Sequence, residues 1–413
     1  MPGTVGRSAL VLVLAALFGA TAAPVEPRAA ESLRQIRQSL GLAIDPDQVS
    51  VSGLSSGGFM ANQLHIVHSQ SFMGAGVIAG GPYHCAGSPS WTCDYTPYGF
   101  YSPHDTCQAV HICTKLARKA YGPFGLYLGP PDATDSVEST LAEAAAGRID
   151  PLSGLKGDRV WLFSGRDDSL VPQEVMDQLQ ASYAALFARP EVTNSPDHIH
   201  YENNQAVEHA MIIAVPGPPE ENNCGTYGPP YINDCDYPTA GELLRFLYDL
   251  PEPNEAPGTP GPQPGGWDQD ALFAFDQSAF FNQADASVSL NAVGHLYVPQ
   301  ACRDGAVCPL HVALHGCEQY QERIDRVCRA DGRCPPLYFF TDAGYNEWAE
   351  RYGLIVLYPQ TIAWGDEGDA AKNPKGCWDW WGYSGRNYFR KDAKQITAIK
   401  RMIDCLGSAE GCP

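Results

Sequence analysis

Short apolar strands and amphipathic helices alternate along most of the chain. Leu33, Ile36 and Leu40 share one face of a predicted helix over 31–42, and Val49-Ser50-Val51 alternates as a strand does. We predict further strands at 74–79, 159–163, 212–215, 294–298, 310–314 and 354–358, and helices at 59–67, 174–187, 241–248, 341–351 and 392–406. This alternation predicts an α/β fold, in which a mostly parallel sheet carries helices on both faces.

Two irregular regions interrupt the alternation. Residues 84–135 are irregular and contain many prolines, tyrosines and glycines. Four cysteines lie within 85–135, and we interpret this Cys-rich stretch as an insertion held by disulfides. Residues 251–266 are rich in proline and glycine and form a semi-rigid linker. A boundary between two domains is the simple interpretation of such a linker.

The N-terminus has the pattern of a secretory signal peptide over residues 1–22. Arg7 supplies the positive charge, residues 9–18 form the apolar run, and Ala20-Thr21-Ala22 is a small-residue cleavage site. No other stretch approaches the roughly 18 apolar residues of a membrane-spanning helix. We therefore expect a secreted, extracellular protein, with the periplasm as the alternative compartment.

Fourteen cysteines, an even number, indicate disulfides in an oxidising compartment. No Cys-x-x-Cys spacing occurs, which argues against a zinc site. Pairing close neighbours leaves Cys317 and Cys377 for each other, although spacing alone cannot fix connectivity. The pairs suggested in this way are Cys85–Cys93, Cys107–Cys113, Cys224–Cys235, Cys302–Cys308, Cys328–Cys334 and Cys405–Cys412.

Composition and charge exclude several functional classes. The hydrophobic fraction of 44% and the charged fraction of 18% are those of a folded protein and not of a disordered chain. The 413 residues include 27 basic and 47 acidic side chains, a formal net charge of −20. This charge argues against binding to nucleic acid or to an anionic membrane.

The segment Gly53-Leu54-Ser55-Ser56-Gly57 lies between a predicted strand and a predicted helix. Gly-x-Ser-x-Gly in this context is typical of the nucleophile elbow of an α/β-hydrolase, in which the serine stands on a sharp turn. A plain Gly-Ser turn is the alternative. A nucleophilic serine needs a base and a carboxylate that orients the base.

The partners of Ser55 should follow it in the order carboxylate, then histidine. Asp167 and Asp168 come after the strand at 159–163, and we prefer Asp168 because it stands closer to the Val-Pro that begins the next helix. His209, just before the strand at 212–215, is the predicted base. His198-x-His200 suggests a metal site, but no third ligand is evident and a solvated loop is preferred; His104, His111 and His295 are interpreted as surface or packing residues.

An oxyanion hole needs two backbone amides, and Ser56 can supply one. The second belongs on a loop after an earlier strand, yet only about thirty mature residues precede Ser55. The strand at 310–314 ends in the expected His315-Gly316 loop, far downstream. Moving residues 267–413 in front of residues 31–250 restores the usual order of strands and helices of an α/β-hydrolase. The linker could therefore join the ancestral termini of a circular permutant. We predict one permuted domain over 23–413 in preference to two domains.

Five segments together resemble a known family. They are the elbow at 53–61, Ala-Gly-Gly-Pro-Tyr-His-Cys-Ala at 79–86, Pro-Tyr-Ile-Asn-Asp-Cys at 230–235, Leu-His-Gly-Cys at 314–317 and Cys-Trp-Asp-Trp-Trp-Gly at 377–382. In this order they look like the single-domain, circularly permuted extracellular poly(3-hydroxybutyrate) depolymerases. The resemblance implies a serine esterase without a cofactor, in which Ser55 is the nucleophile, Asp168 the orienting carboxylate and His209 the base. It also implies that the amides of Ser56 and Cys317 hold the oxyanion.

Trp378, Trp380 and Trp381 are the predicted substrate contacts, because flat apolar rings suit a polyester chain. The alternative is that at least two of them are core residues. Tyr95, Tyr98 and Tyr101 in the insertion could form a second hydrophobic rim.

Two other functions stay open at this stage. One is an esterase for small or plant-wall esters, such as feruloyl or acetyl groups. The other is a non-catalytic binding protein of the same fold, against which the complete set of Ser55, Asp168 and His209 argues. Because a fold does not fix a substrate, the polymer assignment depends on the resemblance.

Overall fold

The computed structural model describes residues 30–87, 104–121, 125–214, 222–251, 266–330, 332, 337–366, 372–408, 410 and 412–413. The predicted signal peptide, residues 252–265 of the linker and the tyrosines Tyr95, Tyr98 and Tyr101 lie outside the described residues. Within the described ranges no helix is long and apolar enough to cross a membrane. The same ranges hold no cluster of three or more side chains suited to a metal ion.

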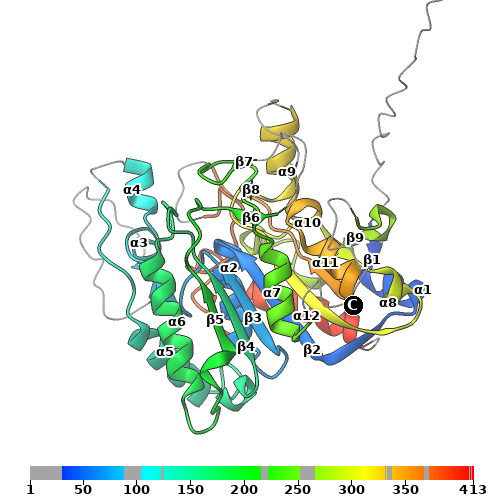
Figure 1. The fold of residues 1–413 in the computed structure, drawn as a ribbon, viewed down its shortest axis with the longest axis horizontal. Coiled ribbons are helices and arrows are strands. Elements are labelled where there is room, and N and C mark those ends of the chain that lie inside the picture. The colour runs from blue at the N-terminus through cyan, green and yellow to red at the C-terminus, as the bar shows by residue number, and fades with distance from the viewer. Residues whose placement is uncertain are drawn as a thin grey trace, which may run out of the picture.

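A nine-stranded sheet forms the centre of the molecule (Figure 1). β10 runs antiparallel to both of its neighbours, and all other neighbouring pairs are parallel. The predicted mostly parallel sheet is therefore confirmed. In spatial order the strands are β1 (Glu31–Ser32), β9 (Leu272–Asp276), β10 (Val293–Tyr297), β12 (Ile355–Tyr358), β11 (Val307–Leu314), β2 (Ala43–Leu54), β3 (Gly74–Ile78), β4 (Arg159–Phe163) and β5 (Ile199–Glu202).

Strands from both sides of the linker share this sheet. β11 pairs in parallel with β2, with Leu310 opposite Val49 and Leu314 opposite Gly53. The carboxyl ends of two strands that lie about 260 residues apart in sequence therefore meet at one edge of the sheet. The origin of this order by circular permutation stays a prediction.

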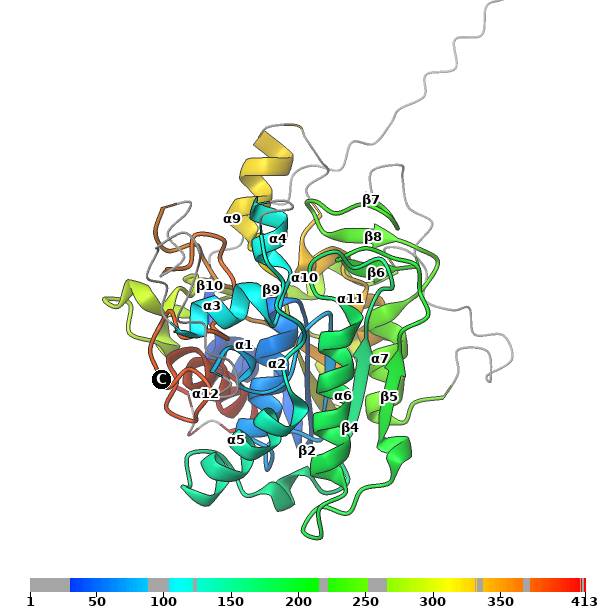
Figure 2. The same ribbon diagram turned by 90° about the vertical axis from the view of Figure 1, so that its left-hand side faces the viewer.

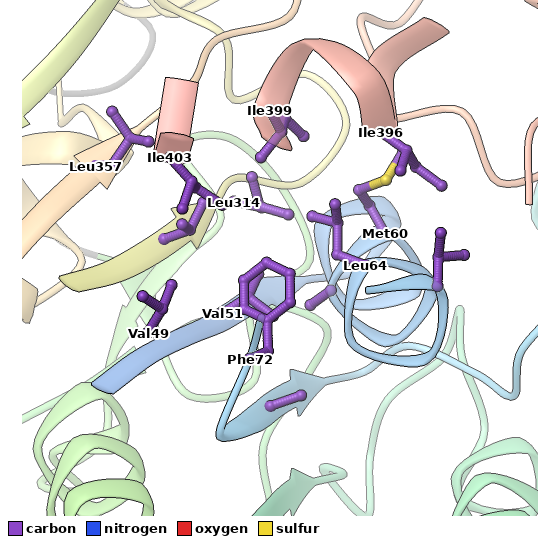
Figure 3. Packing of buried hydrophobic residues seen from close by; sticks show 14 of the residues in the cluster. Val49, Val51, Met60, Leu64, Phe72, Leu314, Leu357, Ile396, Ile399 and Ile403 are labelled. Carbon is purple, nitrogen blue, oxygen red and sulfur yellow. The ribbon is translucent and has the colours of Figure 1, made fainter. Parts of the chain in front are cut away.

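Helices cover both faces of the sheet, as the alternating side chains of β2 show. Val49 and Val51 pack into an apolar layer with α1 (Leu33–Leu40), α2 (Ser56–Val67), α6 (Gln173–Phe187) and α12 (Lys394–Gly407) (Figures 2 and 3). Ser50 and Ser52 point the other way and hydrogen-bond Tyr248 and Tyr345 of the opposite layer. That layer contains α7 (Thr239–Tyr248), α10 (Phe339–Asp342) and α11 (Tyr345–Tyr352). Successive side chains of a strand point to opposite faces, so the two helix layers sandwich the sheet.

Most of the predicted elements form within two residues of the expected bounds, because their apolar periodicity matches a buried face. α1 is also fixed locally: Ser32 caps it by accepting from the amide of Gln35, and Gly41 ends it at φ 62°. The predicted helix over 341–351 is in fact two helices, since Gly344 between them has φ 84°. The prediction missed the strands β5 and β9 and the helix α5 (Ala133–Ala145).

The insertion is more ordered than expected where it is described, and its disulfide pairing differs from the prediction. It contains α3 (His104–His111) and α4 (Leu116–Tyr121). Cys85 is bonded to Cys113, so the predicted pairs Cys85–Cys93 and Cys107–Cys113 are wrong. The reason is that α3 packs against the short turn Cys85–Gly87, which brings Cys113, 28 residues away in sequence, next to Cys85.

Four other predicted disulfides are confirmed: Cys224–Cys235, Cys302–Cys308, Cys317–Cys377 and Cys405–Cys412. Cys334, the predicted partner of Cys328, lies outside the described residues. Beyond the main sheet, β6 (Met211–Ile213), β8 (Ile232–Asp234) and β7 (Asn222–Asn223) form a small parallel sheet. Figures 1 and 2 both show this sheet at the same end of the molecule as α4 and α9 (Gln321–Ile324).

Candidate active site

Ser55 stands on a tight turn between β2 and α2. Its backbone has φ 57° and ψ −120°, which is unusual for a residue with a side chain and stores local strain. The Ser55 amide donates to the Ile78 carbonyl at 2.8 Å, and its carbonyl accepts from the Phe59 amide at 3.0 Å. These bonds hold the turn from both sides, so that the serine projects from the carboxyl end of β2.

The glycines of the elbow allow three backbone segments to approach closely. A Cβ on Gly53 would lie 2.3 Å from the Gly57 carbonyl carbon, and a Cβ on Gly57 would lie 2.3 Å from the Leu314 oxygen. No side chain fits at these distances, so the pattern Gly-x-Ser-x-Gly is required by packing. The same contact places the end of β11 beside the start of α2.

The structure pairs His209 with Asp168. His209 Nδ1 lies 2.7 Å from Asp168 Oδ2, and both side chains are buried. Asp168 Oδ1 accepts from the amides of Leu170 and Val171, each at 2.8 Å, whereas Asp167 is exposed. Because the carboxylate accepts, Nδ1 carries the imidazole hydrogen and Nε2 is left as a base. His209 Nε2 is buried and has no hydrogen-bond partner among the described residues.

Glu208 ties the loop of Asp168 to the loop of His209. Its carboxylate accepts from the amide of His209 at 2.8 Å and from the amide of Ser169 at 3.2 Å. It also accepts a hydrogen bond from the Ser169 hydroxyl. Burial acts to raise the pKa of Glu208, but these hydrogen bonds together outweigh it, so the pKa lies below its ordinary value. No local pattern distinguishes Glu208 in the sequence, although it directly precedes the predicted base.

The loop after β11 lies against the elbow. A Cβ on Gly316 would be 3.4 Å from Ser55 Cβ, so the His315-Gly316 loop and the nucleophile candidate are in contact. Ser56 is the first residue of α2, where an amide has no acceptor within the helix. Within the described residues the Cys317 amide also has no acceptor, while its neighbours Gly316 and Glu318 donate to Gln319 and Lys375. Two unpaired amides thus flank the turn that carries Ser55.

Distant parts of the chain hold this loop in place. The Gln319 amide group donates to the carbonyls of Pro230 and Tyr231, and Trp378 donates its indole N–H to the His315 carbonyl at 2.9 Å. The imidazole of His315 accepts from the Thr361 amide at 3.2 Å. Burial lowers the pKa of His315 to about 4, so the ring stays neutral near pH 7 and keeps this acceptor. The disulfide Cys317–Cys377 closes the arrangement.

Comparison with known proteins assigns the family. No family model matches the chain. A poly(3-hydroxybutyrate) depolymerase of Delftia acidovorans is 36% identical over 374 residues, 90% of this chain and 62% of that protein. A polyhydroxybutyrate depolymerase of Talaromyces funiculosus is 30% identical over 369 residues, 87% of this chain and 89% of that protein. The chain belongs to the poly(3-hydroxybutyrate) depolymerase family.

Solved structures agree with this assignment. The crystal structure of the PHB depolymerase from Penicillium funiculosum matches with a TM-score of 0.66 and 28% identity, over 90% of this chain and 98% of that one. A serine-to-alanine variant of a PHB depolymerase complexed with an R3HB trimer matches with the same TM-score and 27% identity. The chain spans less than two thirds of the Delftia depolymerase, so it covers only part of that longer relative.

The three tryptophans of this depolymerase-family chain occupy different environments. Trp378 is completely buried, and a substrate cannot reach it in this arrangement. The expectation for Trp378 therefore needs correction: its hydrogen bond to His315 makes it a support of the loop after β11. Trp380 is also buried, at 8% exposed, and stacks on Phe59 with ring centres 4.0 Å apart, so two of the three tryptophans are core residues. Trp381 is partly exposed and packs edge to face against Trp380.

Tyr227 and Lys119 lie next to the Asp168–His209 pair and were missed from the sequence. The Tyr227 ring centre is 6.3 Å from that of His209, and its side chain is 37% exposed. Lys119 Nζ, from α4, lies 3.3 Å from the centre of the Tyr227 ring. No local pattern could have joined α4 to this site, because the contact depends on how the insertion folds.

The remaining histidines occupy structural positions. His200 lies on β5 instead of in a solvated loop, and its exposed ring stacks on Trp161. His198 bonds the carbonyl of Asp158, and His295 stacks on Phe340 with ring centres 3.8 Å apart. His111 bonds the carbonyl of Leu126, and the side chain of His104 is outside the description.

Proposed function

We propose that this chain is a secreted serine hydrolase that cleaves the ester bonds of poly(3-hydroxybutyrate)-type polyesters through an acyl-enzyme on Ser55. The observation that carries the proposal is the buried Asp168–His209 pair, with Nε2 left as a base, in a chain whose Ser55 stands on a nucleophile elbow. The names of the relatives support the polymer as substrate. The disulfides and the sequence pattern of residues 1–22 support secretion.

The proposed reaction transfers the acyl group twice. His209 Nε2 takes the Ser55 proton as the hydroxyl oxygen attacks the ester carbonyl, while ionised Asp168 stabilises the imidazolium. The amides of Ser56 and Cys317 donate to the developing oxyanion. His209 then protonates the leaving alkoxide, and a water molecule repeats these steps on the acyl-enzyme to release the acid. The cycle needs no cofactor.

Two further parts of the proposal concern the substrate path and the domain. Trp381 and its neighbour Trp380 are the proposed substrate contacts, since the Trp381 ring is partly exposed and packs edge to face against Trp380. The carboxylate of Asp379 accepts from the amides of Gly382 and Ser384 at 2.7 and 2.9 Å and fixes the turn that carries both rings. The mature chain over 23–413 is proposed to be one permuted domain, supported by the sheet that both segments build.

Clearing of a suspension of poly(3-hydroxybutyrate) granules tests the proposal. We expect the wild type to reduce the turbidity and Ser55→Ala to leave it unchanged. Asp168→Asn should lower the rate by about 10⁴, because the neutral amide no longer orients the imidazole correctly. Asp167→Asn is the matched control and should retain full activity, since Asp167 is exposed and adjacent.

Soluble esters distinguish the remaining alternatives. If the wild type hydrolyses short feruloyl or acetyl esters but does not clear the granules, the polymer assignment fails while the serine hydrolase assignment stands. If no ester is hydrolysed and a serine-directed phosphonate does not label Ser55, the chain is a binding protein of the same fold.

A further inference from the structure

Lys119 is a cation at the histidine side of the site. It lies on α4, within the insertion, and its ammonium is 3.3 Å from the centre of the Tyr227 ring, which is the geometry of a cation–π contact. The Tyr227 ring is 6.3 Å from the His209 ring. Together the distances of 3.3 Å and 6.3 Å place the ammonium within about 10 Å of the imidazole centre.

The ammonium of Lys119 has unused donor capacity. Among the described residues it makes no hydrogen bond, and its one ion pair, with Glu208 Oε1, is 4.0 Å long. The Glu208 carboxylate already accepts hydrogen bonds from the amides of Ser169 and His209. Asp168 likewise accepts from two amides and from His209. The two nearest carboxylates are thus satisfied without Lys119, whose three N–H donors can serve another acceptor.

The chemistry of the leaving group supplies such an acceptor. In a 3-hydroxyacid polyester, the unit that departs as the acyl-enzyme forms carries the alkoxide protonated by His209. When it is the last unit of the chain, it also carries a free carboxylate. The oxygens of these two groups are four bonds apart, at about 4 Å. With a hydrogen bond of about 3 Å at each end, the unit is long enough to reach from His209 to Lys119.

The charge of the whole protein makes this local cation significant. At a net charge of −20, the molecule repels soluble anionic oligomers, so a carboxylate needs a specific positive partner at the site. Tyr227 does not oppose it, because partial desolvation of the phenol and the nearby carboxylate of Glu318 raise its pKa to about 12 and keep it neutral at working pH.

We propose that Lys119, held over Tyr227, binds the terminal carboxylate of the leaving hydroxyacid unit and so favours cleavage of the last ester of short oligomers. This inference rests on the proposed function and adds a preference for chain ends to it. The α4 segment of the insertion then determines specificity, while the chemistry stays with Ser55, Asp168 and His209.

The test compares a linear trimer of 3-hydroxybutyrate as the free acid with the same trimer as its methyl ester. At pH 7 and low salt, the wild type should show a kcat/KM for the free acid about fivefold to tenfold above that for the methyl ester, typical of one partly exposed charge-assisted contact. Lys119→Met should abolish this preference and Lys119→Arg should retain it. Added salt should weaken the preference in the wild type, because the pair is partly exposed.

Lys115→Met is a matched control. Lys115 lies four residues earlier, its ammonium is 5.2 Å from the Tyr127 ring centre, and its ion pair with Glu174 is also 4.0 Å long. The variant therefore loses the same charge and the same kind of ring contact, and it should keep the preference for the free acid.

The outcomes separate this inference from the proposed function. Equal kcat/KM for the two trimers in the wild type, or a preference that survives Lys119→Met, overturns the Lys119 subsite while esterase activity stands. Loss of the preference in Lys115→Met as well would also overturn it, because the effect would then be one of general charge. If Ser55-dependent hydrolysis of every ester is absent, the proposed function fails together with the subsite.

Discussion

The nucleophile turn and the loop after β11 meet at one site but are built in different ways. The turn at 53–58 is specified by its own small residues: Gly53 and Gly57 let β2 and α2 touch, and a hydrogen bond from Ser55 to Ile78 fixes the turn. The loop at 315–319 is held from elsewhere, by Pro230, Tyr231, Thr361, Cys377 and Trp378. The first arrangement is local in sequence and the second is distributed along the chain.

The two parts of the site should therefore respond differently to substitution. A change in the turn acts through direct overlap of backbone atoms, because no room exists for a side chain. A change around the loop removes one of several supports, so the loss of a single hydrogen bond there should destabilise the protein less than a clash in the turn. Part of its effect should fall on the proposed oxyanion amide of Cys317. The four predictions below test this contrast.

The largest effect is expected for Gly57→Ala. The new Cβ would lie 2.3 Å from the Leu314 oxygen and 2.5 Å from the His315 oxygen, both backbone atoms that cannot move independently. We expect a loss of about 3 kcal/mol or more in the free energy of unfolding, with loss of activity. Gly407→Ala is the control, because a Cβ there meets nothing within 4 Å. Equal denaturation midpoints for the two variants would show that the turn tolerates side chains.

Removing the disulfide Cys317–Cys377 should have the next largest effect on activity, with a loss of stability at least as large as that of Gly57→Ala. It closes a loop of 60 residues, for which the chain-entropy relation gives about 4 kcal/mol, against about 2.5 kcal/mol for the 7-residue separation of Cys405–Cys412. The double serine variants of the two pairs should therefore differ in urea midpoint. Only loss of the first pair should lower kcat, since Cys317 lies in the loop beside Ser55. An unchanged kcat would show that the hydrogen bonds alone hold the loop in place without the disulfide.

Acid should weaken the loop before the turn, because the turn at 53–58 has no titratable side chain. His315 has a pKa of about 4 in the folded protein and 6.5 when unfolded, so the unfolded state binds more protons as the pH falls. The stability that neutral His315 contributes is present above pH 6.5 and is lost on the way to pH 4, at up to about 1.4 kcal/mol per unit. Urea unfolding at pH 7, 6 and 5 measures this loss.

His315→Gln is the comparison for the acid series, since the amide can accept from Thr361 but takes up no proton. Its stability should fall less steeply with pH than that of the wild type. Other buried histidines with lowered pKa values, His295, His311 and His68, contribute to both proteins and cancel in the difference. Parallel slopes would mean that His315 is not neutral in the folded state.

The smallest effect is expected for Trp378→Phe. The ring volume is largely kept, but the His315 carbonyl loses its 2.9 Å hydrogen bond, at a cost of about 1 kcal/mol. A positioning role predicts a lower kcat with little change in KM, measured on a soluble ester. A raised KM with an unchanged kcat would instead show that Trp378 contributes to substrate binding.

Much of the fold and part of the site could be predicted from residues that act locally. The strand at 159–163 matches β4 because its apolar run is buried among helices, and Ser55 could be found because its glycines are required by packing. The pairing of Cys85 could not be predicted, since it depends on how α3 folds over the turn that carries Cys85. Lys119 gave no signal for a similar reason: its neighbour Tyr227 is more than a hundred residues away in sequence.

The alternation of strands and helices, the elbow at Ser55 and the acidic, cysteine-rich character of the chain can all be read directly from the residues. Each of these depends on spacing within a few residues or on composition. The choice of Asp168 over Asp167 as partner of His209, the burial of Trp378 behind the loop at 315–319 and the approach of α4 to the site depend on the folded arrangement. Such contacts join residues that the sheet and the insertion bring together, and no local pattern encodes the distance between them.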